Sequence, residues 1–151
     1  MQAQAYSQIA RGPYDISREF RDAAEWSRDQ IAAHHPNEAF RAAARWVPVY
    51  LQTYATQEQA EAGGCATCTY LGLWTNQWPE YPMAPHGLIF LFEDGIRRAR
   101  NTFRGQVYQT LEHELNHALG RDHVLDRLRE LKMHGLDIDG MPIRADSRGC
   151  G

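Results

Sequence analysis

Residues 111 to 123 read LEHELNHALGRDH, and this stretch decides how the rest of the chain is interpreted. Within it, His113, Glu114 and His117 have the spacing H-E-x-x-H. In an α-helix, side chains four residues apart leave the same face about one turn apart, so His113 and His117 can reach one metal ion. The stretch therefore predicts a helix that carries two imidazole ligands with a carboxylate beside them.

The residues after His117 predict how a third ligand is supplied. A catalytic zinc site needs three protein ligands and one open position. Gly120 can adopt the left-handed conformation in which helices commonly end, and the chain turning there would bring His123 under the ion. The full pattern is H-E-x-x-H-x-x-G-x-x-H. The opposite face of the predicted helix carries an apolar stripe that is expected to pack against the core: Val107, Leu111, Leu115 and Ala118.

This pattern resembles the zinc signature of the metzincin clan of metallopeptidases. The resemblance implies that His113, His117 and His123 bind one Zn²⁺ per chain and that Glu114 is the general base. It also implies a methionine-containing turn below the metal, an antiparallel edge strand that holds the substrate, and a polypeptide as that substrate. Outside the signature, the fold has to be predicted from the chain itself.

The periodicity of the preceding residues predicts an α+β fold. Residues 17–46 have the apolar spacing of a long backing helix, interrupted at Pro36. Other patterns predict strands at 47–54, 67–74 and 87–92, a loop or short helix at 56–64, and a short hairpin strand at 96–98. We expect one domain over residues 1–151, metzincin-like with a reduced C-terminal subdomain. In it, a small mixed or antiparallel sheet packs on the backing helix and the zinc-binding helix.

The clearest predicted strand, GLIFLF at residues 87–92, has two interpretations. By the resemblance, Leu88, Ile89 and Phe90 would lie along the cleft as the strand to which an extended peptide adds. Segment 96–98, after its turn, is the other candidate for that role. Alternatively, GLIFLF is a buried central strand, and the sequence does not choose between these positions.

The methionine turn implied by the resemblance has two candidates. A helix is expected from Val124 to about Lys132. Met141 lies in the turn-like sequence D-I-D-G-M-P and is preferred, whereas Met133 at the end of the expected helix is the second choice. Because only ten residues follow Met141, the floor of the cleft is expected to be reduced or supplied by a partner.

The three cysteines suggest a second, weaker metal hypothesis. Cys65 and Cys68 form C-x-x-C, a pattern found in redox motifs, in structural zinc sites and as two ordinary cysteines. An odd cysteine count without an export signal argues against a disulfide framework. The metal hypothesis places Cys65, Cys68 and Cys150 around a second ion, with a histidine such as His86 as the fourth ligand.

Further polar residues lie at the helix break and near the signature. His34 and His35 lie at the break in the backing helix, where they either bind a metal or, as is commoner at a helix end, are exposed; we expect them to be exposed. Three carboxylates near the signature either accept hydrogen bonds from the ligand imidazoles or form ordinary surface charge: Glu112, Asp122 and Asp126.

Composition excludes other classes of function. The chain of 151 residues is 43% hydrophobic with a formal net charge of -3, which gives no electrostatic basis for binding nucleic acid or an anionic membrane. It lacks a segment of the ~20 apolar residues that span a membrane, and its N-terminus lacks the pattern of a secretory signal. We therefore expect a cytoplasmic location with reduced cysteines.

These features predict a zinc-dependent endopeptidase. Glu114 would take a proton from the metal-activated water and pass it to the leaving amine. The alternative is a metal-bound structural or assembly subunit that retains the fold, for example part of a phage virion held in a larger protein assembly. The short C-terminal part and the lack of a secretion signal or pro-segment allow that alternative, but they do not explain the presence of Glu114. A different zinc hydrolase is the third hypothesis.

Overall fold

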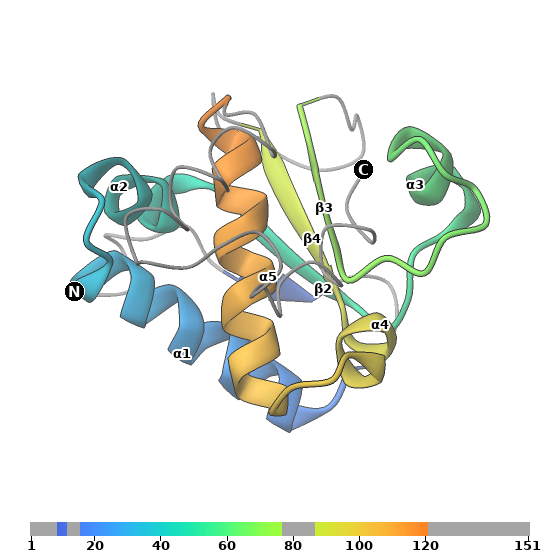
Figure 1. The fold of residues 1–151 in the computed structure, drawn as a ribbon, viewed down its shortest axis with the longest axis horizontal. Coiled ribbons are helices and arrows are strands. Elements are labelled where there is room, and N and C mark those ends of the chain that lie inside the picture. The colour runs from blue at the N-terminus through green and yellow to red at the C-terminus, as the bar shows by residue number, and fades with distance from the viewer. Residues whose placement is uncertain (1–8, 12–15, 77–86, 121–151) are drawn as a thin grey trace.

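The structure is a computed structural model, and it describes residues 9–11, 16–76 and 87–120. Within these residues, a four-stranded sheet has α1 and α5 packed on one face (Figure 1). The expected mixed α+β fold with a small sheet and a backing helix is confirmed. Its elements, in chain order, are β1 (Ile9–Arg11), α1 (Arg18–His34), α2 (Glu38–Trp46), β2 (Val49–Gln52), α3 (Gln57–Ala62), β3 (Gly72–Thr75), β4 (Leu88–Phe92), α4 (Glu93–Arg98) and α5 (Phe103–Ala118).

The predicted backing helix is present, with the predicted break near Pro36. Helix α1 begins after Ser17, whose Oγ accepts a hydrogen bond from the Phe20 N–H at 3.0 Å. His35 has the extended conformation that a following proline favours, with φ -60° and ψ 135°, so α1 ends there. Helix α2 then starts after Asn37, whose Oδ1 accepts from the Ala39 N–H at 2.8 Å. One periodic stretch thus becomes two helices.

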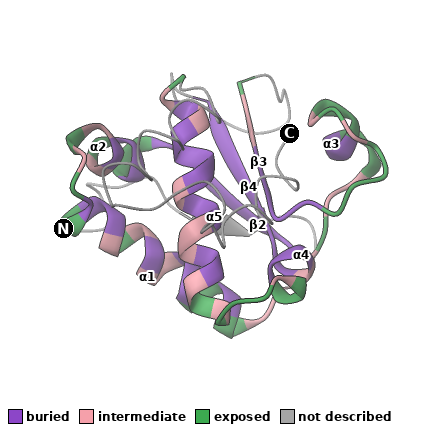
Figure 2. Cartoon of the chain, viewed as in Figure 1, coloured by how far each residue is buried: buried purple, intermediate pink, exposed green. Residues whose placement is uncertain are grey.

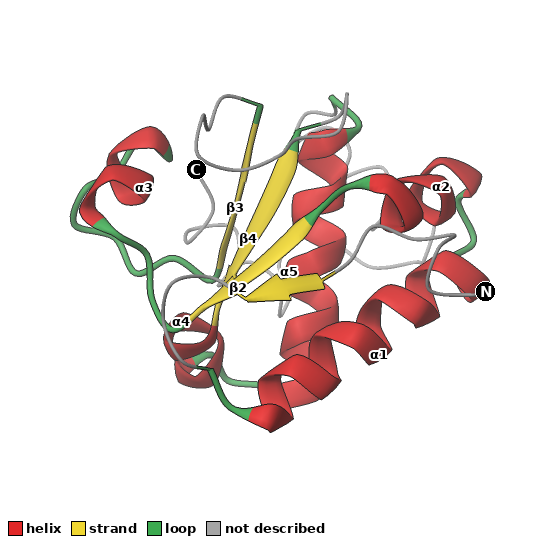
Figure 3. Ribbon diagram, turned by 180° about the vertical axis from the view of Figure 1, so that it is seen from behind, coloured by secondary structure: helices red, strands yellow, loops and turns green. Residues whose placement is uncertain are grey.

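The sheet is mixed. Strands β1, β2 and β4 are parallel, and β3 pairs antiparallel with β4, in the order β1-β2-β4-β3. Figure 3 shows the sheet from behind, with α1 and α5 beyond it. The strands predicted at 47–54 and 87–92 are confirmed, the first of them shorter than expected. Of the strand predicted at 67–74, only residues 72–74 belong to β3, which ends at Thr75.

The hairpin strand predicted at residues 96–98 is wrong, because these residues belong to helix α4. The expected turn before that strand is also absent, because Glu93 and Asp94 form the first turn of a helix that begins directly after β4. Arg97 and Arg98 lie in its last turn, so the charges at both ends complement the helix dipole. Segment 56–64, predicted as a loop or short helix, contains α3, which begins with a capping box formed by Thr56 and Gln59.

The core has two parts because alternate side chains of β4 face opposite sides of the sheet. On one face, Ile89 and Leu91 join the cluster that includes α1 and α5; on the other, Leu88, Phe90 and Phe92 form a second cluster with Tyr50 and Tyr70. All five side chains of β4 have 0% exposure. Figure 2 shows this burial along the strand.

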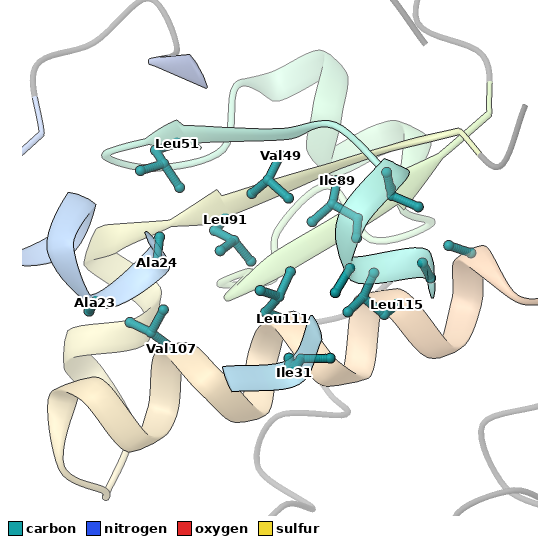
Figure 4. Packing of buried hydrophobic residues seen from close by; sticks show 14 of the residues in the cluster. Ala23, Ala24, Ile31, Val49, Leu51, Ile89, Leu91, Val107, Leu111 and Leu115 are labelled. Carbon is teal, nitrogen blue, oxygen red and sulfur yellow. The ribbon is translucent and has the colours of Figure 1, made fainter. Parts of the chain in front are cut away.

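Helix α5 is fixed by the predicted apolar stripe. Val107, Leu111 and Leu115 are at most 1% exposed and face the strand residues Ile89 and Leu91 (Figure 4). Shortening one of these leucines to alanine would cost about 2–5 kcal/mol of stability. Because the stripe fixes how α5 is rotated, it also fixes where the other faces of this helix point. None of the helices among the described residues is long and apolar enough to cross a membrane.

Candidate metal centre

Helix α5 carries the first two predicted ligands, and its ends are well defined. It begins after Thr102, whose Oγ1 accepts from the Gly105 N–H at 3.2 Å. At the other end, the Leu119 N–H donates to the Leu115 carbonyl at 3.0 Å, and Gly120 follows with φ +73°. The left-handed glycine predicted after His117 is therefore confirmed, and the chain leaves the helix within one turn of that histidine.

The imidazoles of His113 and His117 lie side by side on α5. Their ring centroids are 5.2 Å apart and their planes meet at 85°. His113 is buried at 4% exposure, whereas His117 is partly exposed. The pair therefore has one enclosed member and one member that borders solvent.

This separation fits two ligands of one zinc ion. A Zn–N bond of about 2.0–2.1 Å puts a ring centroid about 3.2 Å from the metal, and a tetrahedral angle then puts two centroids about 5 Å apart. The observed 5.2 Å agrees with that value. Imidazole is a common zinc ligand, so both the donors and their spacing fit the ion.

Glu114, the predicted general base, is fully buried and lies against β3, which is an edge strand of the sheet that the described residues form. The contact is made at Gly72. A Cβ atom at residue 72 would lie 2.9 Å from Cγ2 of Thr110, 3.0 Å from Cγ of Glu114 and 3.1 Å from its Oε2. Only a glycine leaves this space for the carboxylate side chain, so β3 and α5 approach closely at the predicted base.

The second ligand histidine also contacts β3. The indole of Trp74 is stacked on His117, with ring centroids 6.5 Å apart and planes inclined by 17°. The sequence did not single out Gly72 or Trp74, since neither lies in the zinc signature. Their two-residue spacing on a predicted strand was the available signal, because it places both on one face of that strand.

Glu112 has a partner that neither of its two sequence-based roles included. Its Oε2 lies 2.6 Å from Nε2 of His35, which is buried at 7% exposure. The Asn37 N–H donates to Nδ1 of His35 at 3.0 Å, so the ring proton belongs on Nε2 and donates to Glu112. The expectation that both His34 and His35 are exposed is thus wrong for His35, and Glu112 ties α5 to the α1–α2 junction.

The phenol of Tyr108 lies one turn before Glu112 on α5 and is partly buried. Burial raises the pKa of Tyr108, and the nearby Glu112 carboxylate raises it further. Tyr108 therefore stays protonated at neutral pH and packs with Trp26, at a centroid distance of 6.1 Å, as part of the α1–α5 interface.

The remaining predicted residues of the site lie outside the described residues. They include the third ligand His123, both methionine candidates and two carboxylates: Met133, Met141, Asp122 and Asp126. Among the described residues, no group of three or more His, Cys, Asp or Glu side chains is arranged to hold a metal ion. The described part of the chain thus contains two of the three expected ligands.

The second metal hypothesis is contradicted by a disulfide between Cys65 and Cys68. Disulfide sulfurs cannot act as the thiolates that bind zinc. Its other predicted ligands, Cys150 and His86, lie outside the described ranges. The expectation that these cysteines are reduced is wrong for this pair, and the cysteines no longer argue for a reducing compartment.

The substrate-strand prediction for Leu88, Ile89 and Phe90 is also wrong. Strand β4 pairs with β2 on one side and β3 on the other, so it has no free edge, and the alternative of a buried central strand is confirmed. Among the described strands, β3 is the one at the sheet edge next to α5.

Searches with the whole chain found no matching protein-family model and no matching curated protein.

Proposed function

We propose that this chain is a zinc-dependent endopeptidase with a metzincin-like site. The observation that carries the proposal is the spacing of His113 and His117, whose ring centroids are separated as two ligands of one tetrahedral ion would be. Glu114 directly follows the first of these histidines, so its carboxylate is available as the general base beside the ion. His123, three residues after Gly120, is proposed as the third ligand.

In the proposed peptide hydrolysis, the ion and the side chains of the protein have different roles. Zinc, when bound, supplies a Lewis acid that polarises a carbonyl and lowers the pKa of water to about 7. His113 and His117 hold the ion through neutral ring nitrogens. Glu114 takes a proton from the attacking water and delivers it to the leaving amine, which requires a carboxylate beside the ion that is not itself a ligand.

We assign the substrate strand to β3. The Phe92 N–H donates to the Leu71 carbonyl at 2.9 Å, and Gly72 is in register with Leu91. In an antiparallel ladder, this pattern turns the backbone N–H and C=O groups of Gly72 and Trp74 away from β4. In the described part of the sheet, β3 has no other partner. An extended peptide adding to this edge would lie beside the ligand histidines and Glu114.

The alternative, a metal-bound assembly subunit, uses fewer of these features. Holding an ion needs only the histidines. The close approach of Gly72 to Glu114 fixes the position of the predicted base, and a site that only holds a structural ion does not require it. The peptidase therefore accounts for more of the described site.

The experiment compares two carboxylates of α5, Glu114 and Glu112, which lie two residues apart. Wild-type protein should contain one zinc per chain and cleave an unfolded protein, and chelation should abolish cleavage. Glu114→Ala should keep its zinc and lose at least ~10²-fold in turnover. Glu112→Gln is the matched control and should keep both, whereas His123→Ala should bind zinc more weakly. Full cleavage by Glu114→Ala would refute the proposal, and stoichiometric zinc without any wild-type cleavage would favour the assembly subunit.

A further inference from the structure

The indole of Trp74 contacts a metal-ligand candidate and the glycine that precedes β4. On one side, it is stacked on His117. On the other, it lies close to Gly87, where a Cβ atom would be 2.6 Å from Nε1 and 3.0 Å from Cε2 of the indole. Gly87 has φ +85°, a conformation that other residues rarely adopt. The indole fits against residue 87 only because that residue is glycine.

The stacking concerns the less enclosed of the two histidines. His113 is buried, so its surroundings restrict its rotamers, but His117 is partly exposed at the end of α5. A partly exposed side chain loses conformational entropy when a ligand fixes it in one orientation. An aromatic neighbour that already restricts the ring reduces this cost.

We propose that Trp74 is a positioning residue for the metal centre. Its indole holds the His117 imidazole in the orientation in which His117 and His113 bind one ion together. This inference rests on the proposed function, since it assumes that His117 binds a metal. It adds a second role for β3. The backbone of Trp74 faces the edge to which we assign the substrate, and its side chain orients the metal ligand His117. Removal of the aromatic ring should therefore weaken metal binding.

The size of the effect follows from the strength of aromatic contacts. Loss of one stacked pair should weaken metal binding by about 2- to 10-fold. Trp74→Phe keeps a ring on the same strand and should stay within about twofold of wild type. Trp74→Leu removes the ring and should show the full loss. Trp46→Phe, at an exposed position on α2, is the matched tryptophan control.

The test is a titration with Co²⁺ on the metal-free protein, followed by visible absorption and tryptophan fluorescence. We expect wild type and Trp46→Phe to bind Co²⁺ with equal affinity and to lose the same absolute amount of fluorescence to the paramagnetic ion. Trp74→Phe should lose most of the quenching, and Trp74→Leu should also bind more weakly with an altered absorption spectrum. Far-UV circular dichroism establishes that each variant is folded.

Unchanged affinity and spectrum in folded Trp74→Leu would overturn the inference, as would full quenching in Trp74→Phe. Trp74-dependent Co²⁺ binding by a protein that cleaves no peptide would leave the inference standing and remove the proposed function. Failure of the wild-type protein to bind Co²⁺ would overturn both.

Discussion

Gly72 on the edge strand lies against Glu114 on helix α5, so closely that a Cβ atom at residue 72 would come within 3.1 Å of the Glu114 Oε2. Through this contact, strand β3 restricts where the side chain of Glu114, the predicted base, can lie. Thr110 borders the same space, at 2.9 Å from that Cβ position. The packing of β3 on α5 therefore sets where the Glu114 carboxylate can lie.

Gly72→Ala should displace Glu114 and lower kcat without removing the metal. A displacement of about 1 Å at a reacting group can cost about 10²-fold in rate, so we expect a loss of about 10- to 100-fold. Zinc content, measured by mass spectrometry of metal ions, should stay at one per chain. Thr75→Ala on the same strand is the control and should keep its kcat. Wild-type kcat in Gly72→Ala would show that the base tolerates this displacement.

The adjacent histidines of the α1–α2 junction give a second prediction. His35 is buried and bonded to Glu112, whereas His34 is exposed. His35→Ala should lower the free energy of unfolding by about 1.5–3 kcal/mol at pH 7.5, because it removes a hydrogen bond to a charged group and the stacking on Phe40. His34→Ala should change it by less than about 0.5 kcal/mol. Urea unfolding measures both, and equal effects would contradict the assignment of His35 as the link.

The features that the sequence predicted correctly depend on local patterns. The apolar stripe of α5, the left-handed Gly120 and the break at Pro36 each follow from the spacing or backbone preference of neighbouring residues. Such signals act within a few turns of a helix, where chain geometry fixes which residues share a face. They were sufficient to predict the helix that carries His113, Glu114 and His117.

The features that it missed depend on residues far apart in the chain. Whether GLIFLF lies at an edge or in the centre is decided by pairing with β2 and β3, which no pattern within the strand specifies. His34 and His35 are neighbours in sequence, but a partner 77 residues away buries one of them. The contacts of Gly72 with Glu114 and of Trp74 with His117 likewise join two elements that are separate in sequence.

Glu93 joins the start of α1 to α4 and gives a prediction of pH dependence. Its carboxylate accepts from Ser17 N–H at 3.1 Å, from Ser17 Oγ–H at 2.6 Å and from Arg97 Nε–H at 2.9 Å. Burial raises the pKa of Glu93, but the hydrogen bonds from Ser17 and the contacts with Arg97 outweigh it and hold the pKa below its ordinary value of 4.5. The stabilisation is therefore present above pH ~4.5 and is lost as the pH falls through the lowered pKa.

Glu93→Gln should lower the free energy of unfolding by about 1.5–3 kcal/mol at pH 7, where the carboxylate is charged. The difference from wild type should shrink as the pH falls below about 4.5, because a protonated Glu93 resembles glutamine. Denaturant titrations at several pH values measure it, with the exposed Glu58→Gln as control. A difference that stays constant down to pH 3 would contradict the linkage.

The loop that leads from α3 to β3 is held in two ways, and this decides what reduction of the Cys65–Cys68 disulfide should do. The Tyr70 hydroxyl donates to the Ala60 carbonyl and accepts from the Cys65 N–H, both at 3.0 Å, so the loop keeps an anchor without the covalent bond. The ring closed by the disulfide is short, and chain entropy gives it a contribution of about 2 kcal/mol at most. Cys65→Ser/Cys68→Ser should therefore lower the free energy of unfolding by no more than that amount and keep one zinc per chain.

Thiol labelling of the denatured protein tests the disulfide directly. Without reductant, Cys150 should be the single cysteine that reacts, and with dithiothreitol all three cysteines should react. Reaction of all three without reductant would show that the bond is absent. Uptake of a second zinc by the reduced wild type, but not by the double serine variant, would show that the pair binds metal once its thiolates are released, because Zn²⁺ binds thiolates and not disulfide sulfur.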